Sequence, residues 1–169
     1  TPREERKLIN EFLNYPEDSA GTLMTPEYIS LQDTMTVDEA LSYIKKEGMD
    51  SETVYTCYVM DENRRLEGVI TVRQLFMASD DTLISEIMDT NIIFTTTTDD
   101  QERVAHLFAK YDLLSLPVVD QENRLVGIVT VDDVVEVMTQ EVTEDFQLMA
   151  ATSPSERPYL KTGVWDLAK

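Results

Sequence analysis

The second half of the sequence concentrates acidic side chains that could bind a divalent cation. Between Arg124 and Arg157 there are seven acidic residues and no basic one. On a helix that starts near Val131, a polar stripe would run along one face, comprising Asp133, Glu136, Gln140 and Glu144. Like charges three or four residues apart repel, and Mg²⁺ prefers oxygen ligands such as carboxylates. The stripe is therefore interpreted either as a solvated acidic face or as part of a cation site.

One sequence motif occurs twice, and its second copy begins at Arg124, where the acidic stretch starts. RLEGVITVRQL starts at Arg65 and RLVGIVTVDDV at Arg124, and their Arg, Leu, Gly, Thr and Val residues match in position. Thr71 and Thr130 are candidate helix caps, because a hydroxyl at that position can accept a hydrogen bond from the first helical turn. Only the second copy continues with two aspartates, and its Thr130 and Asp133 resemble a capping box, which predicts simple helix capping.

The elements around each phrase predict a β-α-β-β-α unit of about 60 residues. Amphipathic helices are expected over residues 37–47 and 101–111, β-rich runs over 54–60 and 116–120, and short strands over 68–71 and 127–130. A closing helix follows each short strand. In the second closing helix, the expected core contacts come from among Val134, Val135, Met138 and Val142. One unit is too small to bury its sheet alone, so an α+β fold with two units packed sheet to sheet is expected.

Composition narrows the classes of function. The chain has 33 acidic and 14 basic residues, a net charge of −19, which repels nucleic acids and anionic lipids. Its single cysteine, Cys57, lies in an apolar run and is expected to be buried and inert. His106 is expected at a surface or boundary position. With no recognisable nucleophile, base or His/Cys metal spacing, the chain is not expected to be an enzyme.

The paired units with the ending GIVTVDD resemble tandem CBS domains, a Bateman module, over about residues 24–140. In that family this pattern binds the ribose of an adenine nucleotide, which implies Gly127, Thr130 and Asp133 as nucleotide-binding residues. ATP or another adenine nucleotide is thus an implied ligand. The first copy departs from the pattern, because Gln74 stands where the acid would be. The resemblance therefore implies at most one standard nucleotide site.

The flanking segments resemble those of MgtE-type magnesium transporters. FLNYPEDSAGTLMTPEY, from Phe12, is similar to the linker before that family's CBS pair, and the segment from Thr139 is similar to its connecting, or plug, helix. The resemblance implies a helix of a truncated N-domain plus linker over residues 1–20, CBS domains over 21–84 and 85–140, and the plug helix over 141–169. Helical flanks are thus expected at both ends of a pseudo-twofold pair.

The same resemblance implies Mg²⁺ as a ligand and a regulatory role at the cytoplasmic face of the cell membrane. The implied ligands are Glu102, the carbonyl of Ala109, Asp112, Asp133, Glu136, Glu141, Glu144, Asp145 and, in the linker, Asp18. Mg²⁺ would close the domains and shut the pore. The implied partners are a second copy in a homodimer, the protein's own N-domain and its transmembrane domain, with no nucleic acid.

Two alternatives stay open at this point. The first is an adenine-nucleotide sensor that regulates the attached transporter through Thr130 and Asp133. The second is a dimerisation module in which the first closing helix supplies apolar surface from Leu75, Phe76 and Met77.

Overall fold

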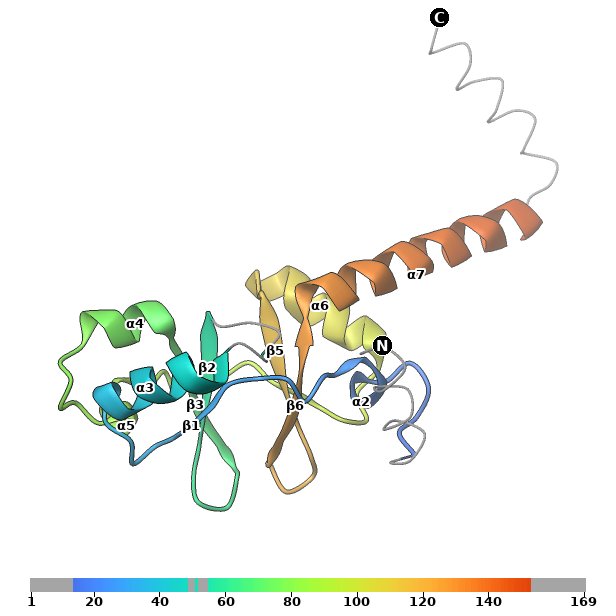
Figure 1. Ribbon diagram of the computed structural model, residues 1–169. Coiled ribbons are helices and arrows are strands. Elements are labelled where there is room, and N and C mark those ends of the chain that lie inside the picture. Colours follow the sequence, from blue (N-terminus) through green and yellow to red (C-terminus); the bar gives the residue numbers. More distant parts are fainter. Residues whose placement is uncertain (1–13, 49–50, 52–54, 153–169) are drawn as a thin grey trace, which may run out of the picture.

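The computed structural model describes residues 14–48, 51 and 55–152, which form two similar halves (Figure 1). The first half comprises β1 (Ser30–Gln32), α3 (Val37–Glu47), β2 (Thr56–Met60), β3 (Leu66–Thr71) and α4 (Val72–Met77). The second comprises β4 (Thr95–Thr96), α6 (Gln101–Tyr111), β5 (Ser115–Val119), β6 (Leu125–Thr130) and α7 (Val131–Thr152). Along the chain, the short helix α2 (Ala20–Leu23) precedes the first half and α5 (Ile84–Ile87) follows it, with Ile84 buried in the core of the first half.

Each half contains a three-stranded sheet with the same topology. The sheet orders are β1-β2-β3 and β4-β5-β6, with the first pair of strands parallel and the second antiparallel. The predicted β-α-β-β-α unit, its duplication and the bounds of both amphipathic helices are confirmed. The helices begin where local signals place them, since Thr36 caps α3 by accepting from the Glu39 amide and Asp100 caps α6 by accepting from the Glu102 amide.

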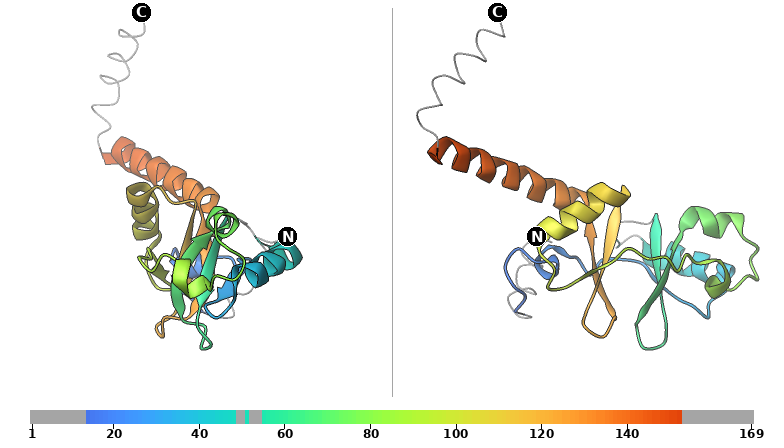
Figure 2. Two further views of the ribbon diagram at one scale, coloured as in Figure 1. Left: turned by 90° about the vertical axis from the view of Figure 1, so that its left-hand side faces the viewer. Right: turned by 180° about the vertical axis from the view of Figure 1, so that it is seen from behind.

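The two sheets pack against each other at the centre of the molecule, and the helices lie outside them (Figures 1 and 2). The layer between the sheets is a cluster of buried side chains from both halves: Tyr58, Met60, Leu66, Val119, Leu125 and Ile128. The Tyr58 hydroxyl also forms a buried hydrogen bond with the Ser115 hydroxyl across the two halves. The expected sheet-to-sheet packing of two small units is confirmed.

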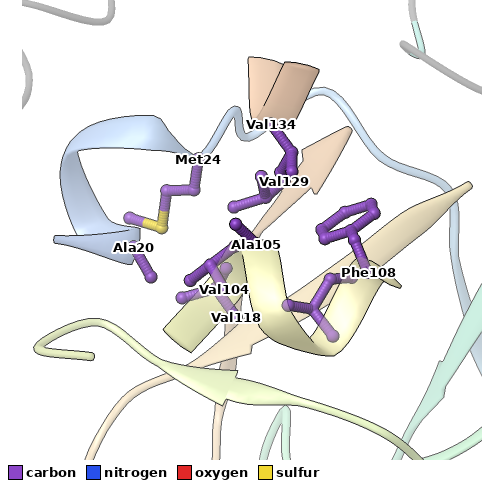
Figure 3. Close-up of a cluster of buried hydrophobic side chains, with 9 residues drawn as sticks. Ala20, Met24, Val104, Ala105, Phe108, Val118, Val129 and Val134 are labelled. Carbon is purple, nitrogen blue, oxygen red and sulfur yellow. The ribbon is translucent and has the colours of Figure 1, made fainter. Parts of the chain in front are cut away.

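The segment that precedes each half is exchanged, because it pairs with the sheet of the other half. Thr25, which precedes β1, pairs with Ile128 of the second sheet through two backbone hydrogen bonds of 2.8 and 2.9 Å. Asp89, which precedes β4, pairs in the same way with Val69 of the first sheet. Ala20 and Met24 are consequently buried in the core of the second half, beside Val104 of α6 and Val134 of α7 (Figure 3).

Candidate cation and nucleotide site

Helix α6 carries three of the predicted ligands at widely separated positions. Glu102 lies in its first turn, Ala109 lies near its end, and Asp112 is its C-cap residue in the left-handed conformation, with φ of 54°. All three residues are exposed. Because a helix rises about 1.5 Å per residue, the separation of ten positions between Glu102 and Asp112 corresponds to roughly 15 Å. One Mg²⁺ ion, with ligands at about 2.1 Å, cannot contact both carboxylates.

The fold sorts the described candidates into two groups at opposite ends of α6. At the first end, the carbonyl of Asp18 accepts a hydrogen bond from the Gln101 amide at 2.8 Å, which brings the linker beside Glu102. Asp18 itself is exposed and has a positive φ of 56°. The first group therefore consists of Asp18 and Glu102.

The second group lies where α6 ends and α7 begins. The amide of Val131 donates to the carbonyl of Leu114 at 3.0 Å, and Ser115 pairs with Thr130 at the adjoining ends of β5 and β6. These contacts bring the chain just after Asp112 against the start of α7. Asp133 and Glu136 follow in the first two turns of that helix, and Glu136 is exposed. The second group thus contains Asp112, Asp133 and Glu136.

The remaining predicted ligands lie further along α7. Their backbone belongs to this helix, which runs without a break from Val131 to Thr152. The side chains of Glu141, Glu144 and Asp145 lie outside the described part of the structure, as does the whole segment 153–169 predicted to continue the plug helix. The predicted helix of residues 4–13 also lies outside it. Among the side chains that the structure does describe, no three His, Cys, Asp or Glu residues are gathered as a metal-binding cluster.

The core-facing side of α7 differs from the sequence prediction. Val134 is buried as expected, but Val137 is the other buried residue, while Val135 and Met138 are exposed. Three valines and a methionine within five positions cannot all face the core of a helix with 3.6 residues per turn. Because all four side chains are apolar, the sequence does not show which of them face the core, and Val137 was not predicted as a core residue. In α4, likewise, Leu75 is buried in the core of the first half, whereas Phe76 and Met77 are exposed.

Each copy of the repeated motif ends in a hydrogen bond between its threonine and the side chain three positions later. In the first half, Thr71 and Gln74 form a capping box, in which the Gln74 side-chain oxygen accepts from the Thr71 amide at 2.8 Å. In the second half, the Thr130 hydroxyl donates to the Asp133 carboxylate at 3.3 Å. The Thr71 hydroxyl also donates to this Gln74 oxygen, at 3.1 Å. Both halves thus pair the threonine with the side chain three positions later, and they differ in that this side chain is a neutral amide in the first half and a carboxylate in the second.

The glycines of the repeated phrases are required by packing. A β-carbon at Gly127 would lie 2.8 Å from the sulfur of Met24, and one at Gly68 would lie 2.7 Å from the sulfur of Met88. Both methionines belong to the exchanged segments. Gly127, predicted as a nucleotide-binding residue, therefore has a structural reason for lacking a side chain.

Two potentially reactive side chains are accounted for by their surroundings. Cys57 is buried in β2, and desolvation raises the pKa of its thiol to about 12, so the reactive thiolate is scarce at neutral pH. His106 is exposed on α6. Both predicted placements are confirmed.

The duplicated unit and its phrase endings define a pair of CBS domains. The chain belongs to the CBS domain family, whose model matches residues 20–81 and 84–140. Within that family it is similar to magnesium transporters named MgtE. It is 45% identical to that of Thermus thermophilus over 158 residues, covering 94% of this chain and 35% of the relative. It is 39% identical to that of Enterococcus faecalis, covering 90% and 34%. The chain thus spans about a third of the length of these relatives.

Comparison with solved structures also finds similarity to magnesium transporters. A crystal structure of the cytosolic domain of the Mg²⁺ channel MgtE in complex with ATP matches with a TM-score of 0.74 and 48% identity, covering 79% of this chain and 54% of the other. The soluble part of a magnesium transporter matches with a TM-score of 0.76 and 40% identity, covering 83% and 55%. None of the helices in the described part of this chain has the length and apolar character needed to span a bilayer.

Proposed function

We propose that this chain is the cytosolic regulatory part of a magnesium transporter and that it senses Mg²⁺ through carboxylates on α6 and α7. The observation that carries the proposal is the difference between the two halves. Where the second half has Asp132, Asp133 and Glu136, the equivalent positions of the first half are Arg73, Gln74 and Met77. Of the two closing helices, only the one that leaves the CBS pair is acidic, and a fold that needed only solubility would not require this asymmetry.

The donor set suits the ion. Asp133 and Glu136 are one helical turn apart and offer oxygen ligands, and Mg²⁺ keeps several waters, so one or two carboxylates per ion are enough. Binding would remove the repulsion between like charges near the start of α7. Mg²⁺ would therefore favour the compact arrangement of the domains, through its preference for that state. In the complete protein, on the cytoplasmic side of the membrane, this compaction would close the transport pathway.

A thermal-melt titration with MgCl₂ tests this proposal. With free Mg²⁺ at ten times its dissociation constant, linkage predicts about 1.4 kcal/mol of added stability. Asp133→Asn combined with Glu136→Gln should at least halve the Mg²⁺-induced rise in Tm and should raise Tm in EDTA, because it removes repelling charges. The control Asp80→Asn with Asp81→Asn removes two exposed charges from the first half and should leave the Mg²⁺ response unchanged. An equal loss of response in both variants would mean that Mg²⁺ acts only on the net charge.

A second function, adenine-nucleotide sensing, is favoured by the Thr130–Asp133 interaction. A hydroxyl beside a carboxylate can bind both hydroxyls of a ribose, and charged acceptors make the stronger bonds. The related cytosolic domain that was solved with ATP adds support. Because Gln74 lacks the charged acceptor that Asp133 provides, we propose one nucleotide per chain, bound by the second half.

Calorimetric titration with ATP tests the nucleotide proposal. Thr130→Ala should weaken binding by roughly fivefold or more, the effect of losing one hydrogen bond of about 1 kcal/mol or slightly more. Thr71→Ala, at the equivalent capping position, should leave the affinity unchanged. Equal weakening by both substitutions would instead indicate a general loss of stability, and a stoichiometry of two would contradict the single site.

We also propose that the chain forms a homodimer through the exposed apolar residues of the first half. Phe76 and Met77 project from α4, and Tyr55 is exposed just before β2, whose neighbouring strand β3 leads into that helix. Phe76→Ser with Met77→Ser should convert a dimer to a monomer in multi-angle light scattering, while Tm at high dilution should change little. A wild-type chain that is monomeric at all concentrations would contradict this partner.

A further inference from the structure

A buried hydrogen bond joins a side chain of the first half to a strand end beside the candidate nucleotide site in the second half. The hydroxyl of Tyr58, on β2, forms this bond with the hydroxyl of Ser115, on β5, and the two residues are only 1% and 8% exposed. Ser115 pairs with Thr130 at the adjoining ends of β5 and β6, and the Thr130 hydroxyl donates to Asp133. Tyr58 is thus connected through a single residue to the pair proposed to bind ribose.

The surroundings of Tyr58 fix its hydroxyl in place. Burial raises the pKa of Tyr58 to about 12, so the phenol keeps its proton at neutral pH. The ring belongs to the layer of side chains between the two sheets. It also packs edge to face with the ring of Tyr28, with 6.4 Å between the ring centroids. Ser115 therefore has a rigidly held partner from the opposite half.

The duplication shows that only the second half can receive this support. By strand register, Thr56 is the first-half equivalent of Ser115, because each pairs with the threonine that ends its hairpin. By the same register, Pro117 is the second-half equivalent of Tyr58. Proline has no side-chain hydrogen-bonding group, so the reciprocal bond to Thr56 cannot form. The half that receives the bond is also the half that carries the charged acceptor Asp133.

We propose that Tyr58 is a positioning residue of the nucleotide site in the second half. Its hydroxyl holds Ser115, and through the strand pairing it holds the end of β6 at Thr130 in the arrangement that binds ribose. Without Tyr58 the Ser115 hydroxyl would be buried and unsatisfied, which is costly. The strand end would then shift to give that hydroxyl another partner, and Thr130 would move with it. This inference rests on the proposed nucleotide binding and deepens it, because the site becomes a property of both halves.

The test is a calorimetric titration with ATP of Tyr58→Phe, which keeps the buried ring and removes only the hydroxyl. The substitution should weaken ATP binding by roughly fivefold. The matched control is Tyr28→Phe. It removes another hydroxyl that bonds across the two halves, since the Tyr28 hydroxyl donates to the carbonyl of Leu125 at 3.3 Å. Because this bond does not involve Ser115, the control should leave ATP affinity unchanged.

A rescue experiment separates positioning from a general loss of stability. Adding Ser115→Ala to Tyr58→Phe removes the unsatisfied hydroxyl, so the double variant should bind ATP more tightly than Tyr58→Phe alone. Three results would overturn the inference and leave nucleotide binding intact: an unchanged affinity of Tyr58→Phe, an equal loss in Tyr28→Phe, or a double variant that binds no better than Tyr58→Phe. A wild-type chain that binds no ATP would overturn the nucleotide proposal together with this inference.

Discussion

Leu125→Ala should lower the free energy of unfolding by about 2–5 kcal/mol. Leu125 is completely buried between the two sheets, in the cluster that contains Tyr58 of the first half and Ile128 of the second. The substitution removes apolar contacts and leaves a cavity that surrounding residues from both halves can fill only by moving together. For a domain of this size, each kcal/mol corresponds to roughly 2–4 °C, so thermal melting followed by circular dichroism will resolve the change.

The matched control for this substitution is Leu114→Ala. Leu114 is 63% exposed, so the same chemical change should alter stability by only about 0.5 kcal/mol or less. If Leu125→Ala caused a loss as small as the control, the layer between the sheets would contribute little to stability, and the two halves would be held together by other contacts.

Gly127→Ala should destabilise the protein by about 1–3 kcal/mol, the usual cost of forcing extra volume into a packed core. The added β-carbon would meet the sulfur, Cγ and Cβ of Met24 at 2.8, 2.9 and 3.0 Å. Although the sulfur is flexible, Cβ is fixed by the backbone, so the lead-in segment itself must shift. The measurement is the midpoint and slope of urea denaturation.

A double-mutant cycle identifies the cause of that loss. In a Met24→Ala background the clash is relieved, so Gly127→Ala should cost markedly less than in the wild-type chain. An unchanged cost in that background would mean that Gly127 is needed for some reason other than its contact with the exchanged segment. Nucleotide affinity measured on the same proteins would separate packing at Gly127 from ligand binding.

Much of the fold could be predicted because its signals are local. Thr36 and Asp100 each precede a run with helical periodicity, and both helices have the predicted bounds. The strands were less sharply defined, since β4 has only two residues and β2 begins at Thr56, two positions later than predicted. Strand ends depend on which residues find partners in the neighbouring strand, and this is a property of the assembled sheet.

The candidate site shows the same division between local and tertiary information. The predicted bounds of α6 already put Glu102 and Asp112 at opposite ends of that helix, but the sequence does not show which other candidates lie beside each end. The grouping of Asp18 with the first end and Asp133 with the second depends on contacts between segments about 80 and 20 residues apart. Val135 and Met138, which were among the expected core contacts, are exposed for a related reason, because the packing of α7 on α6 selects Val134 and Val137.

The exchanged lead-in segments determine how a mechanical load would travel through the molecule. Thr25 is bonded to β6, and Met24 lies in the core beside Val134. A displacement applied at residues 14–25 would therefore pull first on the second half, which carries α7, although these residues precede the first half in the chain. The first half would feel that pull through β1, through the layer between the sheets and through the backbone hydrogen bonds that join its hairpin to that of the second half. Residues 14–25 and α7 are thus both packed on the core of the second half, so a movement of residues 14–25 can reach α7 without passing through the first half.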